Sequence, residues 1–176
     1  HWVKGYGSPR LLLQMHLTYK DGTQDILVSD PSWKVSKSAI VSDMIYQGEH
    51  YDARLEQEGW NTPNFDDSTW QQAVLRKAPC GKLMAQNGPS DRVMETLQPQ
   101  KIEKLDEGRY RIDFGEEISG WVRLNDVEGP AGQRIDIRYI CESKMGTNSY
   151  TLKGKGKESY ATRFTWYVFR EVEISG

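Results

Sequence analysis

The segment from residue 46 to 70, YQGEHYDARLEQEGWNTPNFDDSTW, holds six carboxylates, one arginine, two tyrosines and two tryptophans, and almost no aliphatic residue. Glycoside hydrolysis needs two carboxylates on opposite sides of a sugar, roughly 5 to 10 Å apart. Glu49, Asp52, Glu56 and Glu58 could supply such a pair. Spacing along the chain does not fix that distance, and charged runs mostly face water. The segment is therefore open to a catalytic, a sugar-binding or a purely structural interpretation.

Sugar binding is the interpretation that uses the aromatic residues. Sugar rings stack their C–H faces on aromatic rings, while carboxylates, amides and arginines capture the hydroxyls. Trp60 is placed to be such a platform, with Glu49, Asp52 and Arg54 as hydrogen-bonding partners. Asn87 lies in an Asn-Gly-Pro turn and is a further candidate, although turn formation alone also explains it.

A structural alternative applies to the same residues. Asp52 and Arg54 alternate with Tyr51 and Ala53, so they could share one strand face and form a bidentate ion pair. Such a pair would hold the loop without contacting any ligand.

The whole chain excludes several classes of function. Its 176 residues include 23 basic and 25 acidic ones without a basic cluster, so no nucleic-acid partner is expected. The apolar runs are too short to cross a bilayer, so no membrane partner is expected either. The three histidines are scattered, so we predict no metal site and no cofactor. Cys80 and Cys141 could pair or remain free thiols.

Alternation with a period of two recurs along the chain, which predicts an all-β fold. Residues 11–29 predict a hairpin around an Asp-Gly turn, and four strands are expected within residues 109–176. Residues 55–70 are expected to hold a turn or two of helix. A break near residue 98 predicts two antiparallel β-sandwiches, at residues 1–98 and 99–176. Three tryptophans in alternating or amphipathic contexts are expected in the core: Trp33, Trp70 and Trp121.

Ordered blocks over nearly the whole chain resemble bacterial α-L-rhamnosidases, the inverting glycoside hydrolases that remove terminal L-rhamnose. IYQGEHYDARLEQEGWNTPNFDDSTW is similar to the G-E-x-Y-D-A-R, G-W and F-D-D-S-x-W pattern of that family. DPSWK, which precedes this block, resembles the D-x-S-W-K lead-in of the family. YRIDFGEEISGWVRLNDVEGPAGQ and SYTLKGKGKESY, followed by RFT and FREVEISG, resemble later family elements in the same order.

The resemblance implies a jelly-roll, galactose-binding-like sandwich followed by a concanavalin-like sandwich. In the family, catalysis belongs to a downstream helical barrel, whose D-C-P-x-R-E-R motif does not occur here. No catalytic residue is therefore expected in this chain, and the downstream barrel is the expected partner domain. Some related N-terminal domains bind rhamnose beside calcium. Calcium is not favoured here, because Ala53 follows Asp52 where a second oxygen ligand would help.

Three hypotheses follow. The leading one is a non-catalytic accessory region that helps to recognise an L-rhamnose-containing carbohydrate. The second makes both domains purely structural supports of the barrel, and the third makes the chain an enzyme that uses the carboxylates of residues 49–58. Convergence of Glu49, Asp52 and Trp60 on an open site would favour recognition, whereas an Asp52–Arg54 pair with a buried Trp60 would favour the structural role. Nothing in the sequence fixes the cellular compartment, although the periplasm or the cell exterior would suit such a parent enzyme.

Overall fold

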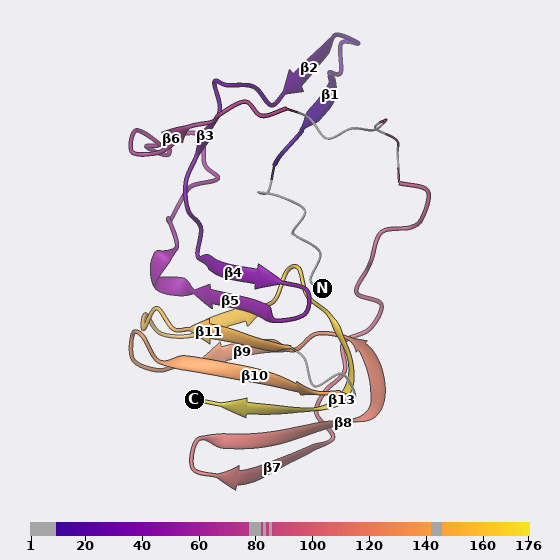
Figure 1. The fold of residues 1–176 in the computed structure, drawn as a ribbon, viewed down its shortest axis with the longest axis vertical. Helices are drawn as coiled ribbons and strands as arrows, with labels where there is room; N and C mark the ends of the chain where they lie inside the picture. Colours follow the sequence, from indigo (N-terminus) through magenta and orange to yellow (C-terminus); the bar gives the residue numbers. More distant parts are fainter. Residues whose placement is uncertain (1–9, 78–81, 83, 85, 142–145) are drawn as a thin grey trace. The chain divides into compact units, whose positions relative to one another are not determined.

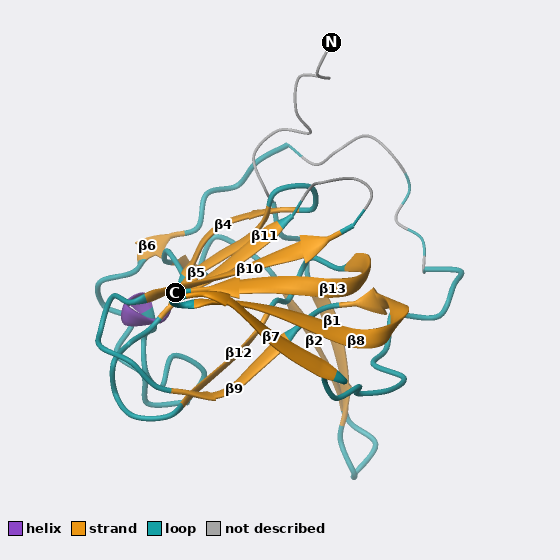
Figure 2. Ribbon diagram, turned by 90° about the horizontal axis from the view of Figure 1, so that it is seen from below, coloured by secondary structure: helices purple, strands orange, loops and turns teal. Residues whose placement is uncertain are grey.

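The computed structural model describes residues 10–77, 82, 84, 86–141 and 146–176. Strands dominate these residues, and a single turn of 3-10 helix is their one helical element (Figure 2). The predicted all-β class is therefore confirmed. The chain divides into two compact units, each of which is discontinuous in sequence. Unit 1 contains residues 1–36 and 59–89, and unit 2 contains residues 37–58 and 90–176.

Unit 1 has two small antiparallel sheets in its described part. The first is the predicted hairpin, whose strands pair from Gln14↔Val28 to Thr18↔Gln24. Gly22 takes a φ of +85° in its turn, where Asp21 accepts hydrogen bonds from the backbone and the hydroxyl of Thr23. The strands of unit 1 are β1 (Gln14–Thr18), β2 (Gln24–Val28), β3 (Lys34–Val35) and β6 (Gln71–Gln72).

Unit 2 is built on a seven-stranded sheet in the order β4-β5-β11-β10-β13-β8-β7 (Figure 1). Its second sheet consists of β12 and β9 (Figure 2). All neighbouring strands are antiparallel except β5 and β11, which run parallel. The strands are β4 (Ile40–Met44), β5 (Gly48–Asp52), β7 (Lys101–Asp106), β8 (Arg109–Gly120), β9 (Arg123–Val127), β10 (Arg134–Ile140), β11 (Thr147–Thr151), β12 (Glu158–Ala161) and β13 (Tyr167–Ser175). The 3-10 turn η1 (Ala53–Leu55) follows β5 directly.

The core of unit 2 follows from the alternation seen in the sequence. In β13, Tyr167, Phe169 and Val172 are buried. The pairing of β13 with β8 is irregular between Phe169 and Glu171, where the register shifts by three residues. Tyr139 from β10 packs edge-on against Phe169, with 4.8 Å between the ring centroids. Most apolar positions of these two strands therefore face inward, whereas Val168 and Ile140 are exposed.

Two predictions from the sequence are corrected by the structure. Residues 55–70 contain turns and η1 ends at Leu55, so the helix expected after it does not form. The backbone N–H of Ser68 donates to the Asp66 carboxylate in a local turn, and β6 begins shortly after it. Trp121 is 38% exposed and is not a core residue, because its neighbour Val122 takes the inward position. Trp33 and Trp70 are only partly buried.

The two units do not follow the single division near residue 98 that the sequence suggests. Residues 37–58 pack with residues 90–176, through the pairing of β5 with β11. The division at residue 98 stays a prediction about domains in the sequence.

Candidate functional site

Glu49 lies inside unit 2 with no exposed surface. Its carboxylate accepts hydrogen bonds from the Tyr160 hydroxyl at 3.1 Å and from the backbone N–H of Arg163 at 3.0 Å. The Arg163 guanidinium completes an ion pair at 3.5 Å. A carboxylate enclosed in this way presents no face to a sugar, so its contacts support a structural role.

Asp52 and Arg54 form the bidentate pair that was the structural alternative. The Arg54 Nε lies 2.9 Å from Asp52 Oδ1, and its Nη2 lies 2.7 Å from Oδ2. The Asp52 carboxylate also accepts a hydrogen bond from the backbone N–H of Arg54 and so caps η1. The hydrogen bond from the Arg54 side chain is the main cause that holds the pKa of Asp52 below its ordinary value. Asp52 is therefore a charged cap of η1.

Glu56 and Glu58 border an open hollow whose lining is mostly charged. Lys153 bridges the two carboxylates, at 2.7 Å from Glu56 and 3.4 Å from Glu58. The Tyr51 hydroxyl also donates to Glu56, at 2.9 Å. The hollow is lined by Ala53, Arg54, Glu56, Glu58, Lys153 and Lys155. The four acidic residues proposed as an acid–base set therefore all have cationic partners within unit 2.

Trp60 and Asn87 belong to unit 1, whereas Glu49, Asp52 and Arg54 belong to unit 2. Trp60 is 62% exposed, and Asn87 is exposed in a bend. The five residues are divided between the two units, so the joint carbohydrate site expected from them stays a prediction. What the structure establishes is an open aromatic ring in unit 1 and the internal pairing of the other three residues in unit 2.

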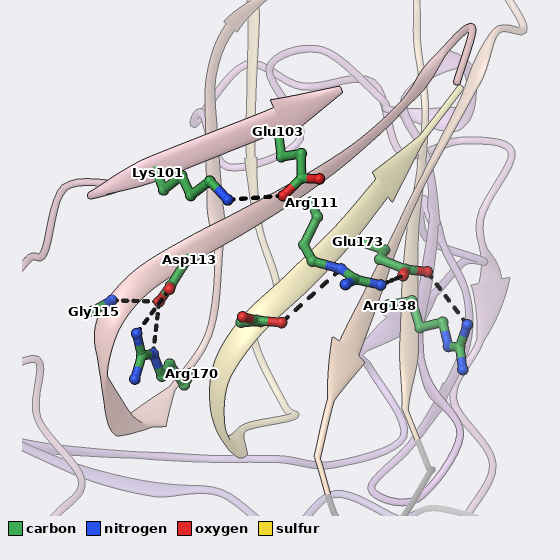
Figure 3. Close-up of polar contacts among 9 residues, drawn as sticks. Lys101, Glu103, Arg111, Asp113, Gly115, Arg138, Arg170 and Glu173 are labelled. Carbon is green, nitrogen blue, oxygen red and sulfur yellow. Dashed lines mark hydrogen bonds and ion pairs between the residues drawn. The ribbon is translucent and has the colours of Figure 1, made fainter. Parts of the chain in front are cut away.

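The outer face of the seven-stranded sheet carries a second group of charged residues, which Figure 3 shows in close-up. Arg111 of β8 lies 2.8 Å from Glu173 of β13, and Arg138 of β10 approaches the other oxygen of that carboxylate at 3.4 Å. Arg170 pairs with Asp113 at 2.8 Å. Opposite charges alternate across the strands here, so the charged side chains of this face form a network of ion pairs.

Sequence reasoning missed the partners of Glu49. Tyr160 and Arg163 lie 111 and 114 positions further along the chain. Asn148 is fully buried, and its side-chain oxygen accepts the backbone N–H of Glu49 at 2.9 Å. No local pattern marks these contacts, because they arise only when β5 pairs with β11.

Neither a metal site nor a membrane helix is found in the part of the chain that the structure describes. No group of three or more His, Cys, Asp or Glu residues there is arranged to hold a metal ion. No helix among the same residues is long and apolar enough to cross a bilayer. Cys80 lies outside the described residues, so its pairing with Cys141 stays open.

Comparison with protein families gives two adjacent matches. Residues 3–95 match the α-L-rhamnosidase N-terminal domain, and residues 103–176 match the bacterial α-L-rhamnosidase concanavalin-like domain. An α-L-rhamnosidase of Streptomyces avermitilis is 36% identical and one of Formosa agariphila is 34% identical, each over 97% of this chain. The chain spans only 18% and 20% of these two relatives.

Solved structures agree with these matches. An α-L-rhamnosidase from Dictyoglumus thermophilum superposes on 98% of this chain with a TM-score of 0.89 and 37% identity, and the match covers 21% of that protein. The Streptomyces avermitilis α-L-rhamnosidase complexed with L-rhamnose superposes on 93% of the chain with a TM-score of 0.84 and 33% identity, over 17% of its own length. By sequence and by fold, the chain belongs to the bacterial α-L-rhamnosidase family, of which it contains the N-terminal and concanavalin-like domains.

Proposed function

We propose that this chain is a non-catalytic accessory region of an α-L-rhamnosidase, which acts on terminal L-rhamnose of glycosides or polysaccharides. The family membership supports the parent activity, and the small share of each relative that the chain covers leaves most of the parent polypeptide outside it. In this proposal the hydrolytic acid and base come from the parent's helical barrel.

The observation that carries the non-catalytic role is the engagement of the acidic residues in the segment first considered for catalysis. An acid–base pair for glycoside hydrolysis needs two carboxylates that face a common space for the sugar. Glu49 is enclosed by Tyr160 and Arg163. Asp52 is held at both oxygens by Arg54, and Glu56 is held by Lys153. These carboxylates support the fold of unit 2 in our proposal.

The test is hydrolysis of a chromogenic α-L-rhamnoside by the purified chain. We expect no release of the chromophore above the buffer control, with a complete α-L-rhamnosidase as the positive control. Turnover at the level of the complete enzyme that persists through repeated purification would refute the non-catalytic role. A Glu56→Gln variant separates the sources of any such activity, because a contaminant would be unaffected by the substitution.

Rhamnose recognition is a second candidate function, and the exposed ring of Trp60 favours it. A tryptophan with 62% of its surface open in unit 1 can offer a stacking platform, and the exposed Asn87 belongs to the same unit. The rhamnose bound in the Streptomyces avermitilis relative makes L-rhamnose the sugar to test. In this candidate function, Trp60 and Asn87 of unit 1 contact the sugar.

A further inference from the structure

Residues 37–58 belong to one domain by sequence and to another by structure. The family match for the N-terminal domain covers residues 3–95, and the match for the concanavalin-like domain begins at residue 103. In space, however, the segment 37–58 is part of unit 2 (Figure 1). It contributes β4 and β5 to the seven-stranded sheet, where β5 runs parallel to β11.

We propose that residues 37–58 are a docking segment without which the concanavalin-like domain does not fold. The Gly-Glu-x-Tyr-Asp-Ala run at its centre is the element that β11, β12 and the turn after β12 recognise. This inference goes beyond the proposed function and does not depend on sugar binding or catalysis.

Gly48 permits the close approach of the two strands. A Cβ atom at this position would lie 2.2 Å from the carbonyl oxygen of Thr147 and 2.8 Å from the side-chain oxygen of Asn148. The residue also has a φ of +95°, a conformation that side chains disfavour. Any other residue would push the start of β5 away from β11.

Glu49 occupies a buried polar site that residues of the concanavalin-like domain form. Its backbone N–H donates to Asn148, and its carboxylate accepts from Tyr160 and from the backbone N–H of Arg163. Without the segment, the hydroxyl of Tyr160 and the N–H of Arg163 would lose this acceptor inside the protein. A buried hydrogen-bond donor without an acceptor destabilises the folded state, so this site favours a residue with an acceptor such as a carboxylate.

Tyr51 and Ala53 supply the apolar part of the contact. The Tyr51 ring packs on Tyr150 and Tyr160, with centroid distances of 5.8 and 5.7 Å, and the Arg163 guanidinium covers it at 4.7 Å. Ala53 is 1% exposed in the same core. The docked segment thus contributes both hydrogen bonds and buried apolar surface.

Removal of the segment would open the sheet at β11. The backbone groups of Ser149, Tyr150 and Thr151 that now face β5 would form an unpaired edge. The side chain of Ser149, which lies 2.7 Å from the His50 ring, would lose its partner as well. A chain limited to residues 99–176 would therefore lack two strands and part of its core.

The first experiment starts from the intact chain. Recognition sites for a sequence-specific protease are placed after Ser36, Glu58 and Pro89, and the cleaved protein is run on size-exclusion chromatography in native buffer. We expect the 37–58 peptide to elute with the 90–176 fragment, as identified by mass spectrometry. Elution of the peptide by itself would overturn the docking proposal.

The second experiment tests whether docking is needed for folding. The cleaved pieces are separated in denaturant, and the 90–176 fragment is refolded alone or with the synthetic 37–58 peptide. We expect a cooperative melting transition only when the peptide is present. A cooperative transition of the fragment alone would show that the segment is dispensable and would overturn the proposal.

Peptide variants test the recognition element independently of how the intact variant folds. Peptides with Gly48→Ala or Glu49→Ala are expected to lose the ability to restore the transition. The matched control is Glu58→Ala, since this side chain is 73% exposed at the end of the same segment. If the Gly48→Ala and Glu49→Ala peptides restore folding as well as the control does, the assigned recognition element is wrong.

Discussion

Arg170 holds both carboxylate oxygens of Asp113 across the neighbouring strands β13 and β8. Nε lies 2.8 Å from Oδ1 and Nη2 lies 2.9 Å from Oδ2, while the backbone N–H of Gly115 donates to Oδ1 at 2.7 Å (Figure 3). The hydrogen bonds from Arg170, followed by the one from Gly115, lower the pKa of Asp113 from 3.8 to about 2. This pair connects the two strands at the point where their register shifts, between Phe169 and Glu171.

The lowered pKa of Asp113 predicts that the contribution of this residue to the free energy of unfolding is lost in acid. Since the folded-state pKa lies below the unfolded one, the stabilisation is complete above about pH 4 and is lost as the pH falls toward 2. We expect Asp113→Asn to lower the urea midpoint at pH 6. The difference from the parent should shrink between pH 4 and 2, whereas a constant difference would contradict the assignment.

Glu49→Ala should destabilise unit 2 strongly. The substitution leaves the Tyr160 hydroxyl and the Arg163 backbone N–H without their acceptor and opens a space in the core. We expect a loss of roughly 3 kcal/mol in the free energy of unfolding, measured by urea denaturation. Glu58→Ala is the control, and its effect should stay within about 0.5 kcal/mol because exposed pairs contribute little. Equal effects of the two substitutions would argue against a structural Glu49.

Aromatic residues of unit 2 should differ in what they contribute to stability. Phe169 is 1% exposed and packs against Tyr139 and Phe114, so Phe169→Ala should cost about 3 to 5 kcal/mol. Trp121 is 38% exposed, so Trp121→Ala should cost only about 1 to 2 kcal/mol. Denaturant midpoints at unchanged m-values would report both. A loss of unfolding free energy well above this range for Trp121→Ala would contradict its assignment as a residue outside the core.

Rhamnose binding, if Trp60 provides it, should be weak. One stacked face and a few wet hydrogen bonds leave little surplus after the entropy lost on binding, so we expect a dissociation constant on the order of 0.1 to 10 mM. Titration with L-rhamnose should shift the NMR signals of Trp60 and Asn87, with and without calcium. Trp60→Ala should abolish the shifts, and Trp121→Ala is the control in unit 2. Unchanged spectra at tens of millimolar rhamnose would leave the domains with a structural role only.

The local features of this protein could be predicted from its sequence. The hairpin of residues 14–28 follows from alternation around an Asp-Gly turn, which depends on neighbouring residues alone. The Asp52–Arg54 pair was also expected from local spacing, but Arg54 lies in η1 and not on the strand, so the pair forms as part of the cap of that turn. The prediction that Trp121 is buried was wrong, because alternation does not say which of two neighbouring residues, Trp121 or Val122, faces inward.

Family membership and the all-β class were determined by the sequence itself, because ordered motifs and strand periodicity are local properties of the chain. Only the tertiary structure decided what the acidic, aromatic segment does. Glu49 looked like a ligand for a sugar, yet residues of β11, of β12 and of the turn after β12 enclose it from more than 90 positions away. The physical reason is that the environment of a carboxylate is set by the groups packed around it, and those groups are brought together by strand pairing and not by nearness along the chain.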